Sequence, residues 1–217
     1  EHRYEFPQEE EKKDDASEEA ESADNKEEKG NGSADDPFYI KREEVETTND
    51  LYINSYVEYN DELWKVIGIE DNKIRIIKND CIKDDSNKCI TRTYSEKDNN
   101  DISLYRNDNL IYYLNTIYYN KLKNKNYITE GKFYIGKYED NNYLRVFDNE
   151  IDMNVGLPSL ADPFAFEVDN TFTITRNINN DTSVFIAKDK HPFETFITES
   201  AYIRPVLFLK PNIKIKD

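Results

Sequence analysis

Residues 55–77 carry the feature that most restricts the fold, which is three strand-like segments separated by two short polar turns. The segments at residues 55–59, 63–69 and 73–77 are rich in β-branched and aromatic side chains. The residues between them are Asn, Asp and Glu, and Asn and Asp favour tight turns. This alternation predicts a three-stranded antiparallel meander, so the fold must include an antiparallel sheet.

Apolar residues within residues 110–122 recur with helical spacing and predict one main helix. They are Leu110, Leu114, Ile117, Tyr118 and Leu122. Their spacing places them on one face, which we interpret as a face that packs against the core. We expect Asn107 or Asp108 to cap the amino end.

The remaining patterns predict mostly strands. Two short strands are expected within residues 131–147, and a turn at residues 156–163. Further strands are expected at residues 171–175, 183–187, 202–209 and 212–216. We therefore predict a single α+β domain at residues 46–217, a β-rich mixed fold with an amino-terminal meander and one main helix.

The first 45 residues are predicted to form a disordered acidic stalk or linker. Residues 1–36 hold 15 acidic and 5 basic side chains, a net charge of −10, which leaves −6 of the total −16 for the rest of the chain. They contain no Val, Ile or Leu, so burial of apolar surface cannot offset the entropy lost on ordering. The segment is either a spacer that holds the domain away from a surface or a solvated tail without further role.

The charge and the apolar pattern exclude two classes of protein. An acidic surface is repelled by a phosphate backbone, so we expect no nucleic-acid partner. The apolar runs are far shorter than the roughly 20 residues that span a bilayer. The chain opens within charged sequence and without Met, and we expect that an export signal or membrane helix was removed, which leaves a membrane tether open. The alternative is a cytosolic protein.

The two cysteines favour an oxidising, extracytoplasmic location. Cys81 and Cys89 flank a polar turn and lie eight residues apart. This spacing suits a small loop closed by a disulfide between two strands, and disulfides persist outside the cytosol. Two unrelated free thiols are the alternative, and a metal site is disfavoured because no His or further Cys lies nearby.

No motif in the sequence predicts catalysis, and we expect a protein that is not an enzyme. The only histidines are His2 and His191, which leaves little for a metal cluster or a nucleophile with a His base. Phosphate-binding glycine loops and hydrolase or metalloprotease motifs are absent from the sequence. Paired carboxylates are abundant, but in so acidic a chain they identify no site.

One acidic loop offers oxygen ligands of the type that Ca²⁺ prefers. Glu96, Asp98 and Asp101 lie close together in the sequence, but the Gly and closing Glu of an EF-hand loop are missing. A hydrophilic loop without a ligand is the favoured interpretation, so no cofactor is predicted, and Ca²⁺ is the weak alternative.

Aromatic residues are frequent, with 16 Tyr and 11 Phe in the chain. Tyr112, Tyr113 and Tyr119 fall partly off the apolar face of the predicted helix. Exposed tyrosines supply contact area for a sugar or a protein at low entropic cost. These three are candidate recognition residues, but the favoured interpretation is that they cover loops on the domain's own surface.

Four segments together resemble a group of bacterial cell-surface domains of unknown function. They are W-x-V-I-x-I at residues 64–69, L-N-x-x-Y-Y at 114–119, V-G-L-x-S-x-x-D at 155–162 and R-P-V-L-x-L-K at 204–210. The resemblance implies an exported or membrane-anchored protein and a relation to C-type-lectin-like folds. It implies no catalytic residue.

These observations predict a secreted or cell-surface-anchored module that binds a protein or a glycan at the cell surface, or serves there as a structural element. The first alternative is an interaction subunit of a surface assembly, such as a pilus-like filament or a membrane complex. The second is a hydrolase of glycans or cell-wall polymers, which would need two carboxyl groups in a cleft.

Overall fold

The predicted meander is confirmed in the computed structural model of the protein. Strands β2 (Tyr56–Tyr59), β3 (Glu62–Glu70) and β4 (Lys73–Lys78) pair in chain order, and both pairings are antiparallel. Each hairpin turn has two residues at positive φ, first Asn60 and Asp61, then Asp71 and Asn72. Two-residue turns with positive φ at both positions match the twist of the strands, and Asn and Asp tolerate this backbone best among residues with a side chain.

The structure describes residues 30–39, 51–97, 99–139, 142–144, 149–211 and 213. The first of its two large sheets extends the meander on both sides, in the order β1-β2-β3-β4-β16-β11, with β6 also paired to β16. The added strands are β1 (Phe38–Tyr39), β16 (Val206–Leu209), β11 (Val155–Gly156) and β6 (Ile128–Thr129). All four residues of β16 are buried, so this strand lies at the centre of the core.

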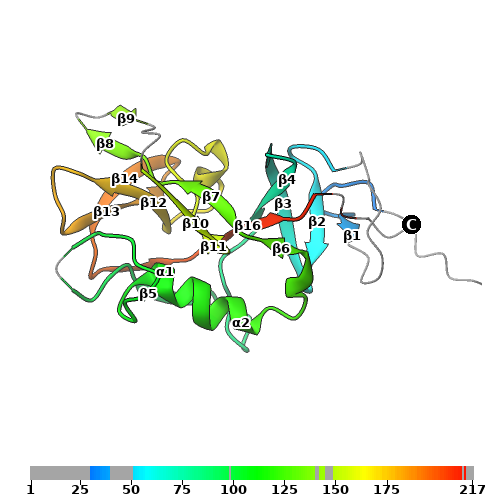
Figure 1. The fold of residues 1–217 in the computed structure, drawn as a ribbon, viewed down its shortest axis with the longest axis horizontal. Helices are drawn as coiled ribbons and strands as arrows, with labels where there is room; N and C mark the ends of the chain where they lie inside the picture. Colours follow the sequence, from blue (N-terminus) through cyan, green and yellow to red (C-terminus); the bar gives the residue numbers. More distant parts are fainter. Residues whose placement is uncertain are drawn as a thin grey trace, which may run out of the picture.

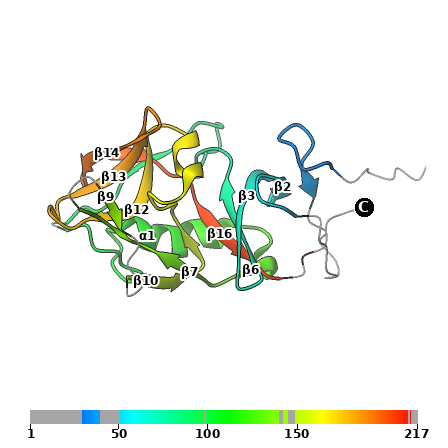
Figure 2. The same ribbon diagram turned by 90° about the horizontal axis from the view of Figure 1, so that it is seen from above.

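The second large sheet has the order β14-β13-β12-β15-β5, and β8 and β9 join it through β12. Its strands are β14 (His191–Phe196), β13 (Ser183–Lys188), β12 (Thr171–Asn177), β15 (Ser200–Tyr202), β5 (Thr91–Thr93), β8 (Lys137–Glu139) and β9 (Asn142–Leu144). Strands β7 (Gly131–Tyr134) and β10 (Glu150–Met153) form a separate pair. Figures 1 and 2 show the two large sheets toward opposite ends of the domain, with the main helix running along one side. This β-rich arrangement confirms a mixed α+β fold.

The main helix is present, but it is interrupted by a π-helical turn. It consists of α1 (Leu110–Tyr113), the π turn η1 (Leu114–Tyr118) and α2 (Tyr119–Lys121). The predicted cap was wrong: Asn109 caps the helix, and its Oδ1 accepts from the backbone N–H of Ile111 at 3.0 Å. Ile117 is 48% exposed rather than part of the buried face, because the wider π turn shifts the register of the residues within it.

Asn115 connects this helix to β11. Its Oδ1 accepts from the backbone N–H groups of Asn154 and Val155, at 3.1 and 3.0 Å. Its Nδ2 donates to the carbonyl of Val155 at 2.7 Å and to the carbonyl of Ile111 at 2.9 Å. The side-chain amide thereby forms hydrogen bonds with backbone groups of both the helix and the β11 segment. This gives the Asn of the L-N-x-x-Y-Y segment a structural role.

The strand predicted at residues 202–209 is wrong as a single element. It is divided into β15 and β16, which belong to different sheets, and Arg204 and Pro205 lie between them. Arg204 is fully buried, and it donates to the carbonyls of Lys78 and Phe164 and pairs with Glu167 at 3.1 Å. The strand change therefore takes place around a buried cation in which each of the three guanidinium nitrogens has a protein acceptor.

Two more predictions concern the ends of the chain. β1 lies within the predicted stalk and pairs in parallel with β2, while residues 1–29 and 40–50 lie outside the described residues. Of the predicted strand 212–216, only the buried Ile213 is described.

A short 3-10 helix, η2 (Lys125–Tyr127), leads from the main helix into β6, and another, η3 (Pro163–Glu167), follows the predicted turn at 156–163. Among the described residues, none of the helices has the length and apolar character that a membrane crossing requires.

Candidate ligand-binding pocket

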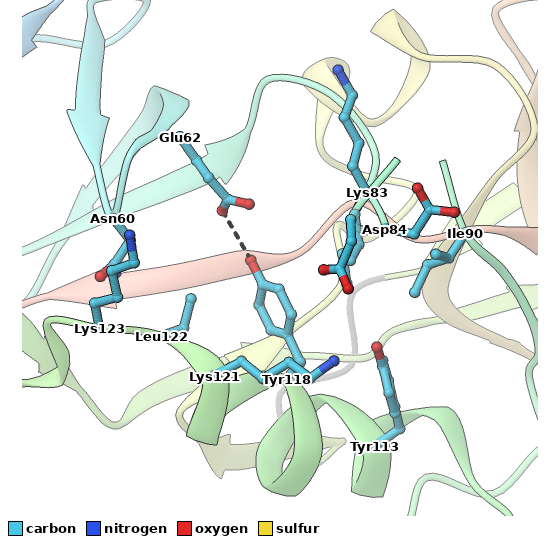
Figure 3. Close-up of a pocket in the computed structure, with 12 residues that line it drawn as sticks. Asn60, Glu62, Lys83, Asp84, Ile90, Tyr113, Tyr118, Lys121, Leu122 and Lys123 are labelled. Carbon is cyan, nitrogen blue, oxygen red and sulfur yellow. Dashed lines mark hydrogen bonds between the residues drawn. The ribbon is translucent and has the colours of Figure 1, made fainter. Parts of the chain in front are cut away.

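A pocket of about 280 Å³ lies between the main helix, the first hairpin turn and the loop closed by the cysteines. Figure 3 shows the helix along one side of the pocket and residues of the disulfide loop along the other, with Glu62 opposite Tyr118. The pocket is at the small end of the range for ligand sites, so it suits a small ligand or one residue of a larger one.

The disulfide loop forms one wall. Cys81 and Cys89 are bonded, with their Cα atoms 5.5 Å apart, which confirms the predicted disulfide. Inside the loop, Asp84 Oδ1 accepts from the backbone N–H groups of Ser86 and Lys88, both at 2.9 Å, and Asn87 takes a positive φ. The predicted polar turn is therefore an Asp-stabilised turn inside a covalently closed loop, which gives this wall a defined shape.

Glu62, which lines the pocket, belongs to a partly buried ion pair. Lys78 Nζ lies 2.6 Å from Glu62 Oε1, and the hydroxyl of Tyr118 donates to Glu62 Oε2 at 3.4 Å. Burial lowers the pKa of Lys78, and the negative charge of Glu62 partly offsets this effect. Burial also raises the pKa of Tyr118 well above its ordinary value, and the neighbouring Glu62 adds to the rise. Glu62 is therefore held in place by a cation and a phenol.

Tyr113 supplies the most informative side chain of the helix wall. Its exposed fraction is 6%, and the guanidinium of Arg92 lies 4.0 Å from the centre of its ring. Burial raises the pKa of its phenol, and the charge of Arg92 opposes the rise. Figure 3 shows the hydroxyl pointing into the pocket, where it has no hydrogen-bond partner among the described residues. A buried ring thus presents one unused polar group to the pocket.

The charges around the pocket divide into paired and unpaired groups. Lys83 pairs with Asp80 at 2.8 Å, and Lys123 pairs with Asp61. The ammonium of Lys121, on the helix side, has no carboxylate within 4.0 Å in the part of the chain that the structure describes. On the loop side, the carboxylates of Asp84 and Asp85 have no cationic side chain within 4.0 Å in that part of the chain. The pocket therefore has an unpaired positive charge on one wall and unpaired negative charges on the other.

The candidate recognition tyrosines lie in different environments. Tyr113 is in the pocket wall, as described above. Tyr112 is half-buried, and its carbonyl accepts from the Thr116 hydroxyl at 2.6 Å. Tyr119 is also half-buried, and the Lys125 ammonium lies 5.3 Å from the centre of its ring. The three tyrosines therefore do not form one exposed surface, and only Tyr113 lines the pocket.

Two of the three weak Ca²⁺ candidates, Glu96 and Asp101, lie in the described part of the chain. Glu96 is exposed, Asp101 pairs with Arg176 at 2.5 Å, and Asp98 lies outside the described residues. The one group of three metal-ligand residues in the described part of the chain is Asp80 with Cys81 and Cys89. Its two sulfur atoms are bonded to each other, which leaves a metal only the carboxylate of Asp80.

Glu62, Lys121 and the role of Asp84 were not predicted from the sequence. Each lies in a different segment of a chain in which charged residues are common, so no spacing distinguishes them. Only Asp84 had a usable signal, because an Asp inside a short disulfide loop is typical of a tight turn.

Comparisons of this chain with protein-family models, with curated proteins and with solved structures found no match.

Proposed function

We propose that this protein is a surface-displayed, extracytoplasmic binding module and that the pocket beside the disulfide loop is its ligand site. The observation that carries the proposal is the hydroxyl of Tyr113, which faces the pocket without a partner although its ring is buried. The hydroxyl opens into the pocket and has no protein partner among the described residues, so both its donor and its acceptor capacity are available to a ligand.

The disulfide supports both the site and the location. It closes the loop that forms one pocket wall, and disulfides persist in oxidising compartments. The relation to C-type-lectin-like folds belongs to the same proposal and rests on the sequence segments alone. Mass spectrometry of protein from its native source tests the location: thiol alkylation without prior reduction should modify neither cysteine, and two free thiols would remove this support.

A binding screen tests the site. Amide-detected NMR of the full chain is recorded with monosaccharides, free amino acids and dipeptides as probes, and shifts are expected at amides near Tyr113, Lys121 and Asp84. Tyr113→Phe removes only the hydroxyl and should weaken the binding of a hit by roughly two- to tenfold. Tyr119→Phe makes the same change outside the pocket and should leave the affinity unchanged. Absence of any hit in the pocket would contradict the proposal.

A second candidate function is an interaction subunit of a surface assembly. The edge strand β14 favours it, because Phe193 and Phe196 are 48% and 60% exposed there. Exposed aromatic side chains on a sheet edge are suited to strand pairing with another chain. Light scattering tests this candidate: concentration-dependent association that Phe196→Lys abolishes would support it, and a monomer at all concentrations would count against self-assembly.

A further inference from the structure

We infer that the pocket binds a small zwitterion, a molecule with one ammonium and one carboxylate group, such as a short peptide or an amino acid. The inference rests on the proposed function and specifies its ligand class. It follows from the unpaired charges on opposite walls, with Lys121 on the helix side and Asp84 on the loop side (Figure 3). Asp85, the next residue of the same loop, also lines the pocket.

The two walls select against singly charged ligands. Lys121 extends from α2, while Asp84 and Asp85 belong to the covalently closed loop, so their separation is set by two different elements. No ion pair joins Lys121 to either aspartate. A ligand with only a carboxylate would pair with Lys121 but bring a negative charge toward the aspartates. A ligand with only an ammonium would pair with an aspartate but bring a positive charge toward Lys121. A zwitterion in one orientation places each of its charges beside the opposite charge of the pocket. Attraction in this orientation and repulsion of the other ligands together make the site specific for a zwitterion.

Tyr113 and the paired groups complete the site. The free hydroxyl of Tyr113 lies on the same wall as Lys121 and can hydrogen-bond the carboxylate of the ligand. Glu62 is held by Lys78, while Lys83 and Lys123 are held by Asp80 and Asp61. Because these residues already have counter-ions, they are less available to pair with a charged ligand than Lys121 and the two aspartates are. The small volume of about 280 Å³ also favours a ligand of this size over a long polymer.

A charge-matched ligand series tests the inference. The probes are alanyl-alanine, its N-acetyl form, its C-terminal amide and the doubly capped neutral form, each titrated calorimetrically into the full chain. The zwitterion should bind at least roughly tenfold more tightly than either singly capped form, since each cap removes one charge-assisted contact. Equal affinities for all four probes would overturn the inference.

Single-charge variants assign the two walls. Lys121→Gln should lower affinity for the zwitterion and for the N-acetyl form but not for the amide. Asp85→Asn should weaken binding of the zwitterion and of the amide but not of the N-acetyl form. Lys88→Gln and Asp181→Asn change the same charges at exposed positions outside the pocket and should have no effect. Variants that weaken all probes equally would count against the two-wall arrangement.

The outcomes separate this inference from the proposed function. Pocket-localised binding of a monosaccharide, with no preference for the zwitterion, would overturn the inference and leave the pocket a ligand site. Binding of no probe at the pocket would overturn both.

Discussion

Arg75 and Asp162 form a bidentate ion pair that joins β4 to the segment before η3. Arg75 Nη1 lies 2.6 Å from Asp162 Oδ1, and Nη2 lies 2.8 Å from Oδ2. The exposed fractions of the two side chains are 14% and 12%. Asp162 Oδ2 also accepts from the backbone N–H of Ser159 at 2.7 Å. The last residue of the V-G-L-x-S-x-x-D segment thus stabilises its own turn and attaches that turn to the first sheet.

Replacing Asp162 with Asn should therefore be strongly destabilising. Asp162→Asn leaves the largely buried guanidinium of Arg75 without its main counter-charge, and we expect a loss of about 3 kcal/mol in the free energy of unfolding. Asp71→Asn is the matched control, because Asp71 is exposed at a positive φ that Asn adopts readily. Urea unfolding of both variants measures the difference, and a loss below about 1 kcal/mol for Asp162→Asn would contradict a structural role.

Two glycines should differ sharply in their tolerance of alanine. A Cβ at Gly156 would lie 2.4 Å from the ring of Phe133, which itself packs edge-on against Phe208 with ring centres 5.2 Å apart. Gly156→Ala should cost about 1 to 3 kcal/mol through overpacking. At Gly68 the nearest atoms to such a Cβ are 3.8 Å away, so Gly68→Ala should be neutral or slightly stabilising. Thermal unfolding of both variants tests this contrast, and equal effects would contradict the close packing at Gly156.

Removal of the disulfide should lower stability and disturb the pocket. Replacing both Cys81 and Cys89 with Ser should cost about 2 to 3 kcal/mol, the value expected when so short a loop is no longer closed in the unfolded chain. The NMR signals of the loop amides should shift, since the loop is a pocket wall. A reducing agent should destabilise the wild type to a similar extent and leave the double variant unaffected. Equal stability of the two proteins would show that the bond adds nothing.

The sequence predicted those parts of the fold that depend on local interactions. The meander at residues 55–77 was predictable because turn residues and β-branched segments alternate within a short stretch. Strands β5 and β14 were not predicted, since β5 has only three residues and β14 contains His191 and Pro192 in a mostly exposed strand. The break at Arg204 and Pro205 was missed because the residues on both sides are equally apolar, and only tertiary contacts direct them to different sheets.

The candidate site was predictable only in part. Cys81 and Cys89 were identified from their spacing, and Tyr113 was among the candidate tyrosines. Glu62, Lys121 and the unpaired state of Asp84 depend on how three distant segments meet, which no local pattern encodes. The π turn also changed which residues face inward. It was not predicted, because a search for regular helical spacing assumes the same number of residues in every turn.

The buried phenol of Tyr118 should make the fold sensitive to alkaline pH. Burial is the main reason that its pKa in the folded protein lies well above the ordinary value of 10.0, and the charge of Glu62 raises it further. Above about pH 10 the unfolded chain releases this proton while the folded protein retains it. The folded state then binds more protons, so the free energy of unfolding falls as the pH rises, whereas below this range Tyr118 contributes no pH dependence.

Unfolding in urea at about pH 8 and about pH 11 measures this effect. Tyr118→Phe should lose less stability between the two pH values than the wild type, by up to about 1.4 kcal/mol for each pH unit above the unfolded pKa. Tyr105→Phe removes a phenol that is 90% exposed and should retain the pH dependence of the wild type. If Tyr118→Phe and the wild type lost equal stability, the phenol of Tyr118 would have to ionise in the folded protein as readily as in the unfolded chain, which its burial beside Glu62 opposes.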